Sequence, residues 1–325
     1  MSIFDKRINY KPYEYGHITD PLINAMWAGH WTHKEYTFES DVQDFQTKLT
    51  EQEQGVVKRA MLMISQVEVA VKSYWSSIGK LLPKPEIAEM GAVFGGIEVI
   101  HSKAYSEVLS KLGFNDDFQA ILSDEIIQGR VNYLQKYNDK VYDNDKKQIA
   151  YSLALFSIFT ENLSLFSQFY TILGFNKFRI VFKDLANIVQ YTSKEENLHA
   201  EGGIALLNQI RKENDSLFDT EFLERILEEA DVALKAEEKI INWILQGYEN
   251  EFLSKEILMT YVKRRLNESF QKLNIDKQYD LNDELVDKTV WMDEEVYASA
   301  LTDFFHKTPI DYTKKMKSFS ADSLF

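Results

Sequence analysis

Two Glu-x-x-His motifs, Glu98/His101 and Glu196/His199, carry the residue types and the spacing of a metal-binding site. Residues three apart project from one face of a helix, so both members of each pair can bind the same ion. A single such motif also arises by chance on a solvated helix face, and one copy alone would indicate little. Two copies in one chain predict a site that holds two ions.

A carboxylate on the preceding helical stretch accompanies each motif. Glu68 comes 30 residues before Glu98, and Glu161 comes 35 residues before Glu196. Glu161 lies inside the apolar stretch 153–166, where a charge is costly to bury unless it is paired or metal-bound. Bundle proteins with two metals use this inventory, a Glu from each of two helices and a Glu-x-x-His from each of two others.

These ligand types indicate which metals the site would take. Carboxylates neutralise two cations and can bridge them, and each imidazole adds a borderline ligand without adding charge. Four carboxylates and two histidines therefore suit iron or manganese in a redox-active pair. The chain has no cysteine, so thiolate zinc sites, iron–sulfur clusters and disulfides are excluded.

Other acidic residues near the motifs are expected on solvated faces or just outside the ligand set. The spacing of three to His199 selects Glu196 rather than its neighbour Glu195 as a ligand. The acidic residues not assigned as ligands are Glu107, Asp124, Glu125, Glu195 and Glu201.

Long helices must position these residues, because the chain has only 5 prolines and 13 glycines to interrupt them. Pro85 suits the first turn of a helix, and Gly113 and Gly174 are expected helix ends. Residues 1–40 are expected to be irregular, and residues 274–310 are expected to have mixed secondary structure. The expected helices span 50–78, 86–112, 117–137, 146–173, 178–213, 220–246 and 254–273.

Composition narrows the class of protein further. The net charge of -14 and the lack of a long basic run exclude a nucleic-acid or acidic-membrane surface. Neither a signal peptide nor an apolar run of membrane-spanning length is expected, so the sequence predicts a cytoplasmic protein. No linker divides it, which predicts one all-α domain over 1–310 and a flexible tail over 311–325.

These motifs resemble those of the small, radical-generating subunit of class I ribonucleotide reductase. EVIHSKAY at 98–105 is similar to that family's E-x-x-H-S-x-x-Y, in which the tyrosine, here Tyr105, is the radical site. KEENLH at 194–199 is similar to R-D-E-x-x-H, with Lys and Glu in place of Arg and Asp. The resemblance runs from about residue 20 to the C-terminus and implies a ferritin-like helical bundle with a di-metal carboxylate centre, assembled as a homodimer.

The resemblance extends beyond the ligands. Trp31 in WTHKE resembles the tryptophan of W-x-P-E-E, which lies on the electron-transfer route, although His33 replaces the proline. Glu195 is the candidate to take the place of the family's usual Asp in linking Trp31 to His101. The tail ending at Phe325 resembles the segment that docks on the large catalytic subunit, and Tyr312 is its only tyrosine. The implied function is to activate an oxygen species and to pass the oxidant through Trp31 and Tyr312 to that subunit, which reduces ribonucleotides.

Two departures bear on the metals. Many members have Asp where this chain has Glu68, and Lys72 follows Glu68 by four residues. Lys72 forms either a surface ion pair worth about 0.3 to 0.5 kcal/mol or a contact with Tyr105 or a ligand carboxylate. The combination resembles the dimanganese subclass activated by superoxide (class Id), in which the tyrosine forms no stable radical. Two iron ions or a mixed manganese–iron pair are the alternatives.

Two other functions remain open on the residues alone. A different ferritin-like di-metal oxidase or hydroxylase would act on a small apolar substrate and have no use for the tail. A non-catalytic iron-storage or structural bundle would assemble as a cage rather than as a homodimer.

Overall fold

Helices make up the regular structure throughout the part of the chain that the computed structural model describes, residues 2–9, 11–70, 73–138 and 145–297, and no strand occurs there. The all-α fold class predicted from the sequence is therefore confirmed. The helices are α1 Gly16–Ala28, α2 Glu39–Thr47, α3 Glu51–Ala70, α4 Ser73–Leu81, α5 Pro85–Leu112, α6 Asn115–Ile121, α7 Glu125–Asn138, α8 Lys146–Leu155, α9 Phe166–Arg179, α10 Lys183–Glu213, α11 Thr220–Leu245, α12 Lys255–Lys272, α13 Asp283–Asp287 and α14 Val290–Tyr297.

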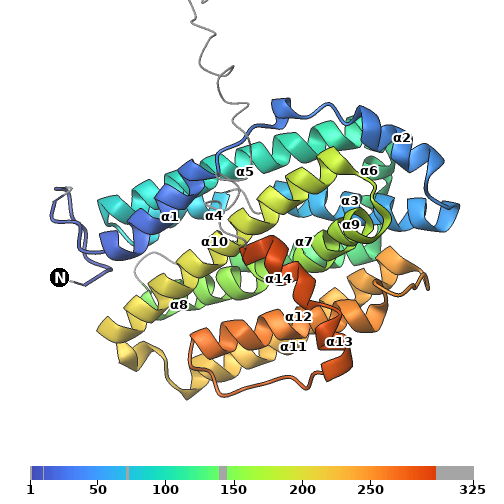
Figure 1. The fold of residues 1–325 in the computed structure, drawn as a ribbon. Coiled ribbons are helices and arrows are strands. Elements are labelled where there is room, and N and C mark those ends of the chain that lie inside the picture. The colour runs from blue at the N-terminus through green and yellow to red at the C-terminus, as the bar shows by residue number, and fades with distance from the viewer. Residues whose placement is uncertain (1, 10, 71–72, 139–144, 298–325) are drawn as a thin grey trace, which may run out of the picture.

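Four long helical elements form the centre of the bundle. α3 packs against α5 and α9, and α10 packs against α9 and α5. α1 lies along α5 on one side, whereas α11 and α12 pair on the opposite side of α10 (Figure 1). This arrangement places the helices that carry the two Glu-x-x-His motifs next to each other.

Several predicted boundaries are confirmed. Thr50 and Glu53 form the expected capping box, in which the Glu53 carboxylate accepts from the Thr50 backbone N–H at 2.9 Å. Pro85 is the first residue of α5, and Gly113 ends that helix with a φ of 77°, which glycine adopts without strain.

Several sequence expectations fail. Residues 1–40 are not wholly irregular, because α1 forms there with Pro21 inside it. The expected helix over 117–137 is divided into α6 and α7. Gly174 does not end a helix but lies within α9, where an added Cβ would sit 3.1 Å from the Phe252 ring. The glycine therefore serves packing rather than a turn.

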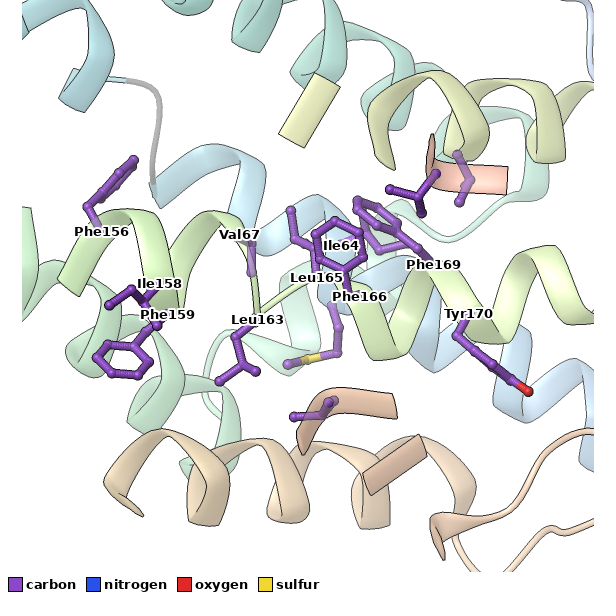
Figure 2. Close-up of a cluster of buried hydrophobic side chains, with 14 of the residues drawn as sticks. Ile64, Val67, Phe156, Ile158, Phe159, Leu163, Leu165, Phe166, Phe169 and Tyr170 are labelled. Carbon is purple, nitrogen blue, oxygen red and sulfur yellow. The ribbon is translucent and has the colours of Figure 1, made fainter. Parts of the chain in front are cut away.

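The largest departure concerns the stretch expected as one α-helix over 146–173. It consists of α8, a π-helical turn η2 (Phe156–Glu161), a short break and α9. Ile64 and Val67 of α3 face the core beside Leu163, Leu165 and Phe166 (Figure 2).

This stretch also corrects the expectation that no apolar run is long enough to span a membrane. Lys146–Arg179, 34 residues long, has an 18-residue window of mean hydropathy 1.4, and that window is wholly buried inside the fold. A core helix of a folded protein meets the same criteria of length and composition.

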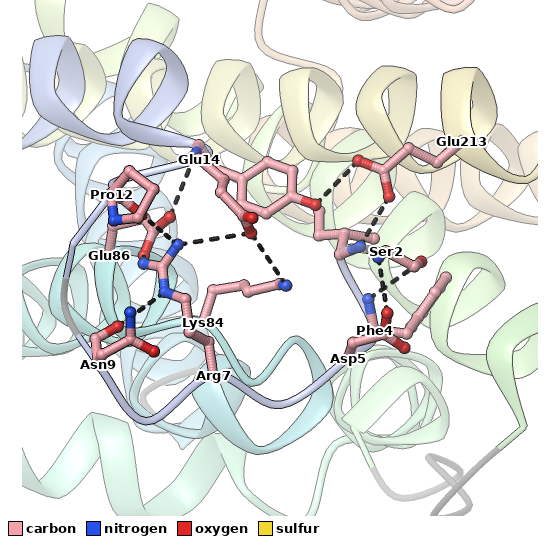
Figure 3. A network of polar contacts seen from close by, with 12 residues as sticks. Ser2, Phe4, Asp5, Arg7, Asn9, Pro12, Glu14, Lys84, Glu86 and Glu213 are labelled. Atoms are coloured by element: carbon pink, nitrogen blue, oxygen red, sulfur yellow. Dashed lines mark hydrogen bonds and ion pairs between the residues drawn. The ribbon is translucent and has the colours of Figure 1, made fainter.

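The N-terminal segment connects the ends of α5 and α10 (Figure 3). Arg7 pairs with Glu86 in the first turn of α5. The backbone N–H of Ile3 and the Tyr15 hydroxyl donate to the two oxygens of Glu213, the last residue of α10, at 2.7 and 2.9 Å. Ile3 itself is fully buried.

The other end of the described chain packs on the same bundle. α14 lies against α10, with Met292 and Val296 buried. The Trp291 indole donates to the Tyr170 hydroxyl at 3.1 Å. The tail with Tyr312 lies outside the described residues, and so does Lys72.

Candidate metal centre

The structure brings together all six residues that the sequence singled out as ligands. They come from α3, α5, η2 and α10 and are fully buried. Their ligand atoms form two groups, and the atoms within each group lie within 4.8 Å of one another. One group is Glu68, Glu98, His101 and Glu196, and the other is Glu98, Glu161, Glu196 and His199.

Glu98 and Glu196 belong to both groups and lie between the two histidines. The Nδ1 atom of His101 is 3.1 Å from Glu196 Oε1 and 3.7 Å from Glu98 Oε2. The Nδ1 atom of His199 is 3.2 Å from Glu196 Oε2 and 3.1 Å from Glu98 Oε1. Each group therefore has one histidine, one carboxylate of its own and two shared carboxylates, which is the arrangement of a bridged pair of ions.

Several buried polar atoms of the site lack hydrogen-bond partners, as expected of atoms that bind metal ions. Among the described residues, neither oxygen of Glu68 or Glu98 has a hydrogen-bond partner, and neither does Glu196 Oε1 or His101 Nδ1. Buried polar groups without partners are costly and rare in folded proteins. Two divalent cations would satisfy these atoms and balance the charge of four carboxylates.

Burial and mutual repulsion perturb the pKa values of the candidate ligands. Burial raises the pKa of Glu68 and of Glu161 well above the usual range, and the nearby Glu196 charge adds to this for Glu161. Burial also acts on Glu196, but the neighbouring Glu161, His101 and His199 side chains outweigh it and hold its pKa well below the usual range. The protonated forms of Glu68 and Glu161 are therefore favoured without a cation, and a metal ion that binds these carboxylates would displace the protons.

The π-helical turn presents Glu161 to the site. A π turn contains an extra residue, and the backbone N–H of Ser164 bonds to the carbonyl of Phe159 five residues earlier at 3.2 Å. Glu161 is the last residue of the turn, so the insertion sets the direction of its side chain. Such turns inside α-helices occur frequently at functional sites.

Glu195 contacts the site from outside the ligand set. Its Oε2 atom lies 2.7 Å from Nε2 of His101, and the Trp31 indole N–H donates to its two oxygens at 3.2 and 3.1 Å. The Trp31 ring is buried and stacks on Tyr191 with 5.7 Å between ring centroids. Trp31 is thus connected to the candidate ligand His101 through the single carboxylate of Glu195.

The sequence did not predict that Trp75 contacts the site. Trp75 of α4 donates its indole N–H to Glu161 Oε1 at 2.7 Å, and its ring lies 5.9 Å from that of His199. A tryptophan in an apolar helix is usually part of the core. Only the three-dimensional fold shows that this one reaches a carboxylate.

Tyr105 lies one helical turn after His101 and is fully buried. Its hydroxyl has no hydrogen-bond partner among the described residues. Burial, reinforced by the Glu68 carboxylate, raises the pKa of this phenol well above its usual value. The prediction that Lys72 contacts Tyr105 stays a prediction, because Lys72 lies outside the described residues.

Comparisons with known proteins agree with this geometry. The family described as "Ribonucleotide reductase, small chain" matches residues 7–285. A "Probable ribonucleoside-diphosphate reductase small subunit" of invertebrate iridescent virus 3 is 25% identical over 329 residues, covering 97% of this chain and 86% of its own. The ribonucleoside-diphosphate reductase subunit beta of Halalkalibacterium halodurans is 25% identical over 307 residues, covering 90% and 85%. The crystal structure of Streptococcus sanguinis dimanganese(II)-NrdF shares the fold, with a TM-score of 0.72, 16% identity and coverage of 88% of this chain and 99% of that one.

Proposed function

This chain belongs to the ribonucleotide reductase small-chain family, and from that premise we propose that its metal centre generates the oxidant that starts ribonucleotide reduction in a large partner subunit. The observation that carries the proposal is the pair of ligand groups that share Glu98 and Glu196, with Trp31 attached through Glu195. A storage or structural bundle has no need of such a connection.

Each residue of the site would have a distinct role in binding the metal ions or in electron transfer. Glu68 and His101 would hold one ion, Glu161 and His199 the other, and the shared carboxylates would bridge them. When bound, the two ions supply a redox-active pair that reacts with an oxygen species and retains one oxidising equivalent. Glu195 accepts from the Trp31 indole and fixes the His101 ring, so an electron arriving at Trp31 is two hydrogen bonds from the ligand set. Complete burial of the ligands keeps bulk water away from the oxidant.

We propose two manganese ions activated by superoxide as the working metals, with di-iron and mixed manganese–iron pairs as alternatives. The dimanganese relative shares the fold, and Tyr105 has neither a hydrogen-bond partner in the described structure nor a pKa that favours loss of its proton. Metal analysis and EPR of protein loaded with each metal test this proposal. An active di-iron form with a stable tyrosyl signal would refute it.

The proposed partners are a second copy of the chain and the large subunit, the latter bound through the tail 311–325 with Tyr312 as the relay. Deleting 311–325 should abolish reductase activity and large-subunit binding while leaving metal content unchanged. Retained reductase activity would refute the role of the tail, whereas a full-length chain that does not bind the large subunit and oxidises a small substrate by itself would favour an oxidase or hydroxylase. Size-exclusion chromatography should show a homodimer, and a cage-sized assembly would favour storage.

A further inference from the structure

Arg265 of α12 is a buried cation outside the ligand set. Its side chain is only 1% exposed, and its guanidinium carbon lies 3.3 Å from the centroid of the Phe166 ring. Within the described ranges, no carboxylate lies at ion-pair distance from it. Burying a charge without such a partner is costly unless several hydrogen bonds satisfy it. The partners that do satisfy Arg265 indicate what it does.

Those partners are the residues that directly follow two of the proposed ligands. Arg265 donates from Nε to the carbonyl of Asn162 at 2.9 Å and from Nη2 to the Asn197 side-chain oxygen at 3.2 Å. Asn162 follows Glu161, and Asn197 follows Glu196. One guanidinium thus connects the π-helical turn with α10 immediately beside the metal centre.

The contact with Asn162 runs in both directions. The Asn162 side-chain oxygen accepts a second bond from Arg265, and its amide donates to the Arg265 carbonyl at 3.0 Å and to Ser269 Oγ at 2.6 Å. These bonds join α12 to the chain where helical geometry ends after Glu161. An irregular buried backbone needs such partners for its polar groups.

We propose that Arg265 is a positioning residue that holds the carboxylates of Glu161 and Glu196 in place for the second metal ion. The proposal rests on the proposed function. Asn162 directly follows the π-helical turn that carries Glu161, and Asn197 directly follows Glu196 on α10, so the bonds from Arg265 restrain the backbone beside both carboxylates. Glu161 belongs only to the group that contains His199, and therefore loss of Arg265 acts most strongly on that ion.

The test is a Mn²⁺ titration of the full-length Arg265→Lys variant, which keeps the positive charge but not the forked donor geometry. Wild type should bind two ions. In the variant the second ion should bind about 10- to 100-fold more weakly, as when the partners of metal ligands are removed. At a Mn²⁺ level that fills both wild-type sites, EPR of the variant should change from a coupled pair to an isolated Mn²⁺ signal.

Arg264→Lys is the matched control, because Arg264 is the adjacent buried guanidinium on α12 but donates to Thr289 and Asp293 instead. It should bind two ions as wild type does, and an equal loss in this control would overturn the positioning role. Unchanged two-ion binding by Arg265→Lys would also overturn it. Wild type binding fewer than two ions would instead refute the proposed function. If Arg265→Lys does not fold, Asn197→Ala removes one of the bonds alone, and wild-type affinity in that variant would overturn the inference.

Discussion

Glu195→Gln tests how strongly a residue outside the ligand set controls the metal centre. The substitution keeps the size of the side chain and creates no cavity. It replaces a carboxylate that contacts His101 Nε2 at 2.7 Å and the Trp31 indole N–H at 3.1 Å. When His101 binds a metal through Nδ1, its Nε2 carries the proton and must donate.

The magnitude follows from counting donors and acceptors. His101 and Trp31 then present two donors, and Glu195 Oε2 lies 2.7 and 3.1 Å from them. A glutamine oxygen can accept both bonds but is uncharged, and its amide group replaces Oε1, which also accepts from Trp31. Two buried hydrogen bonds therefore lose their charged acceptor, which costs about 1.5 to 3 kcal/mol in all. Because each 1.4 kcal/mol is a factor of ten, we expect Mn²⁺ to bind about 10- to 100-fold more weakly.

The assay is competition for Mn²⁺ against a chelating indicator, with chemical denaturation of the metal-free protein alongside it. Glu201→Gln is the control, because Glu201 lies on the same helix but accepts from Lys272 at the edge of the fold. Affinity in Glu195→Gln equal to that of the control would refute the reasoning. It would mean that the His101 ring is oriented by the ligand cluster alone.

Three further outcomes are expected. Burial, opposed by the Arg130 charge, raises the pKa of Glu237 to about 7, so the protonated form is favoured on folding. Wild type should therefore lose about 3 kcal/mol of unfolding free energy as pH rises from below about 4.5 through 7, measured by denaturant titration at each pH. A Glu237→Gln variant whose unfolding free energy falls equally with pH would contradict this. Gly203→Ala would place a Cβ 1.8 Å from Ser157 Oγ and 2.7 Å from its Cβ, so it should destabilise the protein by about 1 to 3 kcal/mol or more. Adding Ser157→Gly should recover part of the loss in thermal denaturation, and no recovery would mean that the strain lies elsewhere. Glu98→Gln removes a carboxylate that belongs to both ligand groups. Mn²⁺ at a hundred times the wild-type Kd should therefore stabilise wild type by about 2.7 kcal/mol and the variant far less. Equal Mn²⁺-induced shifts in Tm would mean that Glu98 is not shared by two ions.

The clustering of the six residues was predictable because helical periodicity carries spacing in sequence directly into space. Glu98 and His101 share a face of α5 through local geometry alone, and an acidic residue in an apolar helix, such as Glu161, already indicates a buried partner. Their roles as metal ligands remain predictions that the titrations above address.

The π-helical turn could not be predicted in the same way. Its residues are ordinary helix-compatible apolar side chains, and a π turn differs from an α turn only in which carbonyl each N–H selects. That choice is supported by contacts with distant parts of the chain, such as Arg265 with Asn162. Trp75 was missed for a related reason, because nothing local shows which buried polar atom an indole will meet.

The contacts at the two ends of the described chain set the limits of any shortened version of this protein. A chain cut to the family-matched residues 7–285 would lose Ile3 and its bond to Glu213 at one end. At the other end it would lose Met292 and Trp291, whose side chains cover α9 and α10. The packed structure therefore extends beyond the residues that the family model matches. A minimal version for crystallisation or binding studies should keep residues 2–297.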